Sequence, residues 1–211
     1  MTTDAPSPSE LLQAIDDLAG IAGEFCAAVE AARNGDDAGF IDRLDELLPL
    51  LYHRAARLNS IAPDDLFDAD EELFESEQDF PAAGGDQEPV ASDDVDRVAD
   101  ELAAKLAQIL GWRNRYYEAV VESDEENDYD VEQHLLSEDL ATMYGHLKDQ
   151  LAVHGALDRA SLGPDGDVQD FARDLLTGFM AVWGFRIPHL MMAVFDLMYG
   201  ELHEGEEEEP V

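Results

Sequence analysis

The sequence LLSEDLATMYGHLKDQL, residues 135–151, has the pattern of a capped helix with one apolar face. Ser137 is a suitable N-cap, and two acidic residues follow it in the first turn, where carboxylates interact favourably with the helix dipole. The apolar residues then recur at three- and four-residue spacing, as Leu140, Met143 or Tyr144, Leu147 and Leu151. We therefore predict a helix over 137–154 that lies near the centre of an all-helical core.

Apolar stripes with the same spacing predict further helices on both sides of this segment. These helices run over 7–34, 37–60, 92–110 and, as one long apolar region, 168–202. Ser7 and Glu10 match a capping box at the start of the first helix. The last region is expected to divide or kink at Gly184 and Pro188, and its core stripe to continue through Ile187, Leu190, Met191, Val194, Phe195 and Met198.

Three residues interrupt the regular pattern inside the predicted helices. Pro49 should kink the second helix, because proline lacks an N–H donor and clashes with the preceding turn. Gly20 and Gly23 lie inside the first helix, where each costs about 1 kcal/mol relative to alanine. We interpret the two glycines as positions where another helix approaches closely.

The remaining segments are aromatic or acidic. Residues 112–121 predict a helix with Trp112, Tyr116 and Val120 on one face, and the acidic stretch over 122–133 predicts a loop. We expect an acidic, partly mobile linker over 64–91 and a disordered acidic tail over 205–211. No stretch alternates strongly enough to predict a strand. The predicted fold class is therefore all-α, a single multi-helix bundle of about six helices over 1–204.

The charge balance is the strongest feature of the composition. The 211 residues include 50 acidic and 12 basic side chains, a net charge of -38, and the lysines are Lys105 and Lys148. Three explanations compete for this charge: adaptation to high salt, mimicry of nucleic acid or binding of a basic protein, and calcium binding. Here the acid is spread over every segment and lysine is scarce, which favours a salt-adapted bacterial cytoplasm. The same charge disfavours nucleic acid and anionic membranes, which need a basic face.

The sequence carries no motif that predicts an active site. Cys26 is the single cysteine and sits among apolar neighbours, so we interpret it as a core residue. The six histidines lack the spacings of zinc and di-iron sites, and the acidic stretch over 124–132 lacks the central glycine of an EF-hand. We predict no catalytic, cofactor-binding or metal-binding residue, and we favour a non-enzymatic protein over an enzyme. No signal peptide and no apolar run of about 18 residues is visible, so we expect a cytoplasmic protein.

Two segments, LSEDLATMYGHLKDQL (136–151) and FMAVWGFRIPHLMMAVFDLMYGEL (179–202), together resemble the bacterial domain-of-unknown-function family numbered 5063. The matching residues are Ser137, Glu138, Asp139, Leu140, Ala141, Tyr144, Leu147, Lys148, Asp149, Trp183 and Gly184. Weaker similarity extends over most of 40–202. The sequence departs from the family after Gly184, where the family tends to have histidine and this chain has Phe185, Arg186 and Pro188. The resemblance implies an α-helical fold, no established activity and no catalytic residues.

The residues Asp139, Tyr144, Trp183 and Arg186 are the candidate lining of a groove beside the central helix, where a partner protein would bind. The alternative is core packing for the aromatic residues, with Asp139 paired to an arginine that holds two helices in register. The predicted function is a non-enzymatic interaction or scaffold protein. Two alternatives remain, a helical maturation chaperone that binds a precursor peptide and a small-molecule enzyme without a recognisable motif. The sequence specifies neither a partner nor an oligomeric state.

Overall fold

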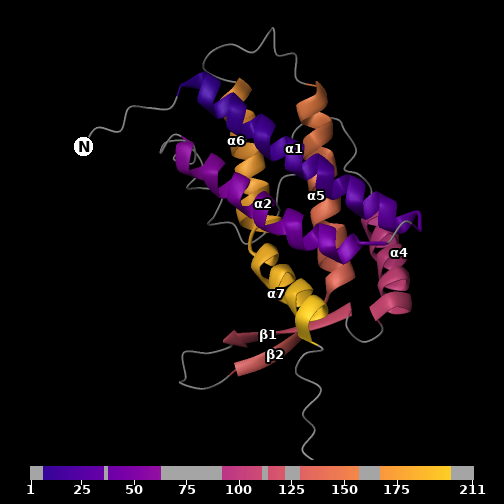
Figure 1. Ribbon diagram of the computed structural model, residues 1–211. Helices are drawn as coiled ribbons and strands as arrows, with labels where there is room; N and C mark the ends of the chain where they lie inside the picture. The colour runs from indigo at the N-terminus through magenta and orange to yellow at the C-terminus, as the bar shows by residue number, and fades with distance from the viewer. Residues whose placement is uncertain are drawn as a thin grey trace, which may run out of the picture.

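The computed structural model describes residues 7–35, 38–62, 92–110, 114–121, 129–156 and 167–200. In these ranges the chain forms six α-helices, one π-helical segment and one β-hairpin, which confirms the predicted all-α bundle (Figure 1). The helices are α1 (Pro8–Arg33), α2 (Phe40–Ile61), α4 (Ser92–Leu110), α5 (Leu136–Ala156), α6 (Asp167–Gly178), η4 (Phe179–Trp183) and α7 (Arg186–Tyr199). The predictions for Trp112, the linker over 64–91, the domain boundary at 204 and the tail lie outside the described residues.

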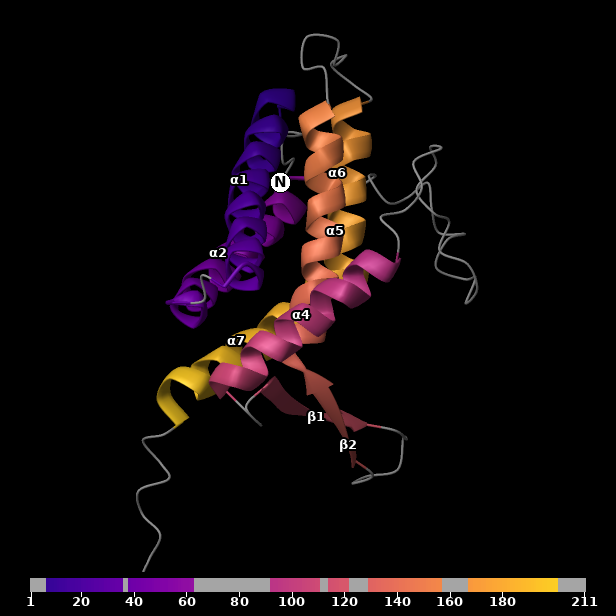
Figure 2. The same cartoon turned by 90° about the vertical axis from the view of Figure 1, so that its right-hand side faces the viewer.

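Helices α1 and α2 pack side by side along one side of the bundle (Figure 2). The predicted capping box starts α1, since the Glu10 N–H donates to Ser7 Oγ over 3.3 Å and the Ser7 N–H donates to Glu10 Oε2 over 2.9 Å. Helix α2 continues past Pro49 as one helix. The interpretation of Gly20 and Gly23 is wrong, because a Cβ at either position would meet no described atom within 4 Å outside its own helix backbone.

Helix α5 lies at the centre of the fold, in contact with α1, α4 and α6 (Figure 2). Its buried face consists of Leu140, Ala141, Met143 and Leu147, each at most 1% exposed, as the apolar spacing predicts. The predicted N-cap is two positions late, because the helix begins at Leu136 and Ser137 lies inside its first turn. Asn114, which lies directly before strand β1 (Arg115–Val121), instead satisfies polar groups at this helix end. Its Oδ1 accepts the Ser137 N–H over 3.2 Å, and its Nδ2 donates to Ser137 Oγ over 3.2 Å.

The β-hairpin contradicts the helix predicted over 112–121 at residues 115–121, and the loop predicted over 122–133 at residues 129–133. Strands β1 (Arg115–Val121) and β2 (Tyr129–Leu135) pair antiparallel, with Arg115 opposite Leu135 and Val121 opposite Tyr129. The spacing of four between Tyr116 and Val120 misled the prediction, because it places two residues on one face of either a helix or a strand. The hairpin lies at the end of the bundle where α5 begins (Figure 1).

The C-terminal apolar region divides at Gly184, as predicted, and the two parts meet at 53°. The Gly184 N–H donates to the Phe179 carbonyl over 2.7 Å and closes the π-helical segment. A Cβ at Gly184 would overlap that carbonyl oxygen and the Phe179 ring, so the bend requires glycine. Within the described ranges, no single helix is both long and apolar enough to span a bilayer. The segments Val168–Trp183 and Arg186–Tyr199 reach that length and hydropathy only when they are taken together.

Candidate functional site

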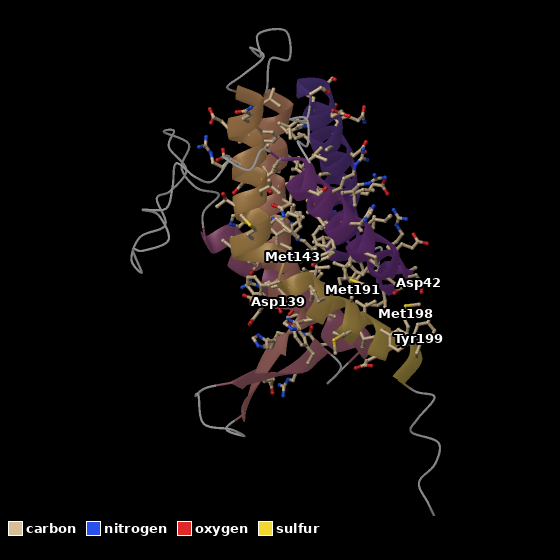
Figure 3. All side chains as sticks on the ribbon, turned by 90° about the vertical axis from the view of Figure 1, so that its left-hand side faces the viewer. Asp42, Asp139, Met143, Met191, Met198 and Tyr199 are labelled. Atoms are coloured by element: carbon tan, nitrogen blue, oxygen red, sulfur yellow. The ribbon has the colours of Figure 1, made fainter. Side chains whose placement is uncertain are left out.

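Asp139 and Arg186, two of the four predicted groove residues, form an ion pair. The Arg186 Nε–H donates to Asp139 Oδ1 over 2.8 Å, and the Arg186 NH1 group donates to the Val182 carbonyl. The Tyr116 hydroxyl donates to Asp139 Oδ2, so both carboxylate oxygens accept a hydrogen bond. Asp139 is 8% exposed and lies near the hairpin end of the bundle (Figure 3). The structure thus bears out the alternative in which Asp139 pairs with an arginine, and this pair joins α5, α7 and β1.

Two histidines lie beside this ion pair. The ring of His134 stacks on Tyr116 with centroids 5.4 Å apart, and the ring of His189 lies 6.4 Å from Tyr116. Because Asp139 already accepts from a guanidinium and a phenol, its carboxylate is held in place. This arrangement suits a structural junction between three elements.

Tyr144 faces a different neighbour, helix α1. Its hydroxyl donates to Glu30 Oε1 over 2.9 Å, and Lys148 Nζ donates to the same oxygen over 2.6 Å. Burial, followed by the Glu30 carboxylate, raises the pKa of Tyr144, while the hydrogen bond from Lys148 lowers the pKa of Glu30. Tyr144 therefore helps to join α5 to α1 rather than lying next to Asp139 and Arg186.

Trp183 is fully buried, so its side chain contributes no accessible surface. Its ring meets Phe179 edge-on, with centroids 5.0 Å apart, and Phe179 in turn meets Tyr52 at 5.6 Å. The four predicted groove residues thus occupy three separate environments: the Asp139–Arg186 pair, the contact of Tyr144 with α1, and the core position of Trp183.

A small cavity of about 10 Å³ lies between α1, α5 and α6. Apolar side chains such as Leu18, Leu147 and Phe171 line it, together with His154. A cavity of this size has room for about one water molecule, so it does not hold a metabolite. In the part of the chain that the structure describes, no cluster of three or more His, Cys, Asp or Glu residues is arranged to hold a metal ion.

The outer side of α7 is the largest feature that the sequence analysis missed. Phe185, Met192, Phe195 and Tyr199 are 52%, 67%, 57% and 43% exposed, respectively, and we call these four side chains the α7 ridge. Their spacing of seven, three and four places them on one face of the helix. The prediction that Phe195 belongs to the core stripe is therefore wrong.

The opposite side of α7 belongs to the core. Ile187, Leu190 and Val194 are fully buried there, as predicted, so α7 is apolar on two faces. The sequence held a signal for the second face, because Phe185, Met192, Phe195 and Tyr199 follow a helical period of their own. An exposed Phe or Met is unremarkable alone, but four in one line form a continuous apolar surface.

Comparisons with known proteins agree with this fold. The crystal structure of protein BF1032 from Bacteroides fragilis is similar to this chain, with a TM-score of 0.57 and 22% sequence identity. The match covers 93% of this chain and 96% of that one. No curated protein matches the sequence. The model of the family described as domain of unknown function (DUF5063) matches residues 9–200. The chain therefore belongs to the DUF5063 family, as the resemblance of its two C-terminal segments implied.

Proposed function

We propose that this protein is a non-enzymatic interaction protein that binds a partner protein on the α7 ridge. The observation that carries the proposal is the exposure of Phe185, Met192, Phe195 and Tyr199 on one helix face. Contiguous exposed apolar surface is uncommon on monomeric proteins and often marks an interaction site. Aromatic residues and methionine are also the types enriched at the centres of protein interfaces.

The packing beneath the ridge supports this role. Ile187, Leu190 and Val194 fix α7 in the core, and helix α2 packs along it. The ion pair of Arg186 with Asp139 holds the first residue of α7 against α5. A helix anchored in this way loses little conformational entropy when a partner binds to its outer side chains. Preorganisation of this kind increases affinity.

A matched pair of variants tests the proposal by affinity capture from a lysate of the native host. The first variant, M192E/F195E, places two charges on the ridge. The control, V153E, places a charge on a 43% exposed apolar residue near the C-terminal end of α5, at the far end of the bundle from α7 (Figure 1). The wild type and V153E should retain the same partner, and M192E/F195E should lose it. Equal capture by all three proteins, each shown to be folded by circular dichroism, would contradict the proposal.

The acidic composition supports a salt-adapted bacterial cytoplasm as the working environment. At molar salt the Debye length falls to about 3 Å, so the repulsion among 50 acidic side chains is largely screened. An acidic, lysine-poor surface is then compatible with a stable fold. High salt also strengthens the burial of apolar surface when the salt is of the kosmotropic kind, which favours binding on the α7 ridge.

A further inference from the structure

We propose that the occupant of the α7 ridge is a single cationic amphipathic helix of the partner protein. This inference rests on the proposed function and adds the chemical class of the partner. Three observations carry it: the size of the ridge, the exposed thioether side chain at its centre, and the carboxylates around it.

The size of the ridge suits one helix. A fully buried aromatic side chain covers about 150–250 Å², so four side chains that are roughly half exposed offer about 400 Å². A stable interface between two folded proteins needs about 800 Å² on each side. The ridge is therefore too small to hold a second copy of this chain by itself. It matches the apolar stripe of one helix, since the 14 residues of α7 extend over about 21 Å.

The ridge side chains can pack against apolar helix faces that differ in their exact side chains. The rings of Phe195 and Tyr199 lie 4.8 Å apart and form one aromatic block. Met192 lies one turn before Phe195, is 67% exposed, and has a flexible thioether that adapts to the shape of a partner. Helical partners are recognised in this way through side chains at three- and four-residue spacing.

The charges around the ridge select a basic partner. Asp196 is exposed and lies four residues after Met192 and three before Tyr199, so it shares their side of the helix. Asp42 of α2 lies near the Met198–Tyr199 end of α7 (Figure 3). In the described ranges, neither carboxylate takes part in an ion pair.

The arginine of α7 does not offset this negative charge. Arg186 is already bonded to Asp139 and to the Val182 carbonyl. A partner helix with lysine or arginine beside its apolar stripe would pair with Asp196 and Asp42. An anionic peptide or lipid surface would be repelled.

The experiment uses three fluorescently labelled amphipathic helical peptides with the same leucine face. Their polar face carries lysine, glutamine or glutamate, and each is titrated into the full chain while fluorescence anisotropy is measured. The lysine peptide should bind at least about tenfold more tightly than the glutamine peptide, a factor that corresponds to about 1.4 kcal/mol. The glutamate peptide should bind most weakly.

Two pairs of variants locate the binding. The double substitution M192S/F195S should weaken binding of the lysine peptide at least about tenfold, since it removes two large apolar side chains from the ridge. V153S, an equivalent change at the far end of the bundle, should leave binding unchanged. D196N should weaken binding about two- to fivefold, as expected for an exposed pair. D170N removes an exposed carboxylate from the first turns of α6 and should have no effect.

The outcomes separate this inference from the proposed function. Equal binding of the lysine and glutamine peptides, with loss in M192S/F195S, would overturn the basic partner and leave α7 as the docking surface. Unchanged binding of the lysine peptide by M192S/F195S would overturn both, because attraction to the acidic surface as a whole would then explain it. If the protein self-associates in sedimentation velocity and M192S/F195S abolishes this, the ridge binds a second copy of the chain. If the protein binds phosphatidylcholine–phosphatidylglycerol vesicles, the ridge binds a lipid surface. Either result would overturn the inference.

Discussion

Arg186 donates its Nε–H to Oδ1 of Asp139 over 2.8 Å and thereby joins the first residue of α7 to the first turn of α5. The Tyr116 hydroxyl donates to the other carboxylate oxygen, so the hairpin is bound at the same point. Asp139 is 8% exposed, and a buried carboxylate is costly unless it is paired. The position of α7, and with it the α7 ridge, depends on this junction.

Loss of the guanidinium should therefore destabilise the fold. We expect R186M, which keeps much of the side-chain volume, to lower the free energy of unfolding by about 1–3 kcal/mol, because it leaves Asp139 with the Tyr116 hydroxyl alone. The control is R43M, which removes two ion pairs, to Glu24 and Glu46, whose side chains are about half exposed. Its effect should stay below about 1 kcal/mol. Urea denaturation measures both, and equal losses in the two variants would contradict the role of the junction.

Two glycine-to-alanine substitutions should have opposite signs. G184A should destabilise the protein by about 1–3 kcal/mol, because the new methyl group overlaps the Phe179 carbonyl and ring. G20A should stabilise it by about 0.5–1 kcal/mol, since the methyl group meets open space and alanine reduces the conformational freedom of the unfolded chain. Thermal unfolding checks both. A stabilising G184A would show that the bend between η4 and α7 does not require glycine.

The Cys26 thiol should be inert in the folded protein. Burial, opposed in part by Lys148, raises its pKa to about 12, so almost no thiolate is present near pH 8. A cysteine in an unfolded chain has a pKa of about 8.5, and its thiolate fraction at pH 8 is therefore larger by about a thousandfold. Reaction with a chromogenic disulfide reagent should be slow in buffer and complete within minutes in urea. Because the folded pKa is raised, the stability due to Cys26 is present below pH 8.5 and falls as the pH rises towards 12. Rapid labelling without denaturant would contradict the buried position of Cys26.

The melting temperature should rise with potassium chloride over the range from about 0.1 to 3 M. Screening of exposed charges is nearly complete once the Debye length falls to about 3 Å, so adaptation to molar salt predicts a rise that persists at the upper end. Differential scanning fluorimetry measures the curve. A curve that is flat, or that saturates below about 0.3 M, would contradict adaptation of the protein to molar salt.

Most of the fold was predictable because the buried faces of the helices follow a regular period. The 92–110 prediction coincides with α4, and Gly184 divides the last apolar region as expected. The hairpin was not predictable from spacing, because Tyr116 and Val120 share a face in either geometry. The tyrosines and valines of 115–121 favour a strand, but that preference is weak without knowledge of the pairing strand.

The candidate site was only partly predictable. Asp139 and Arg186 were predicted to lie in one groove, and pairing of Asp139 with an arginine was weighed as the alternative. No sequence feature near Tyr116 indicates that its hydroxyl completes the junction. The α7 ridge was missed because an apolar helical stripe is normally buried, and α7 has two of them. Which stripe faces the core is decided by the packing of α2 and α5, far away in the sequence.

Site-specific photocrosslinking tests the central claim most directly. A benzophenone side chain at position 192 should crosslink the lysine peptide, and the same group at position 153 should not, because the two sites lie on α7 and near the far end of α5. Both positions are exposed and lie within a helix, so the probe is presented in a comparable way. Crosslinking at 192 alone is the predicted result. Equal yields at both positions, or a higher yield at 153, would contradict the assignment of the α7 ridge as the docking surface.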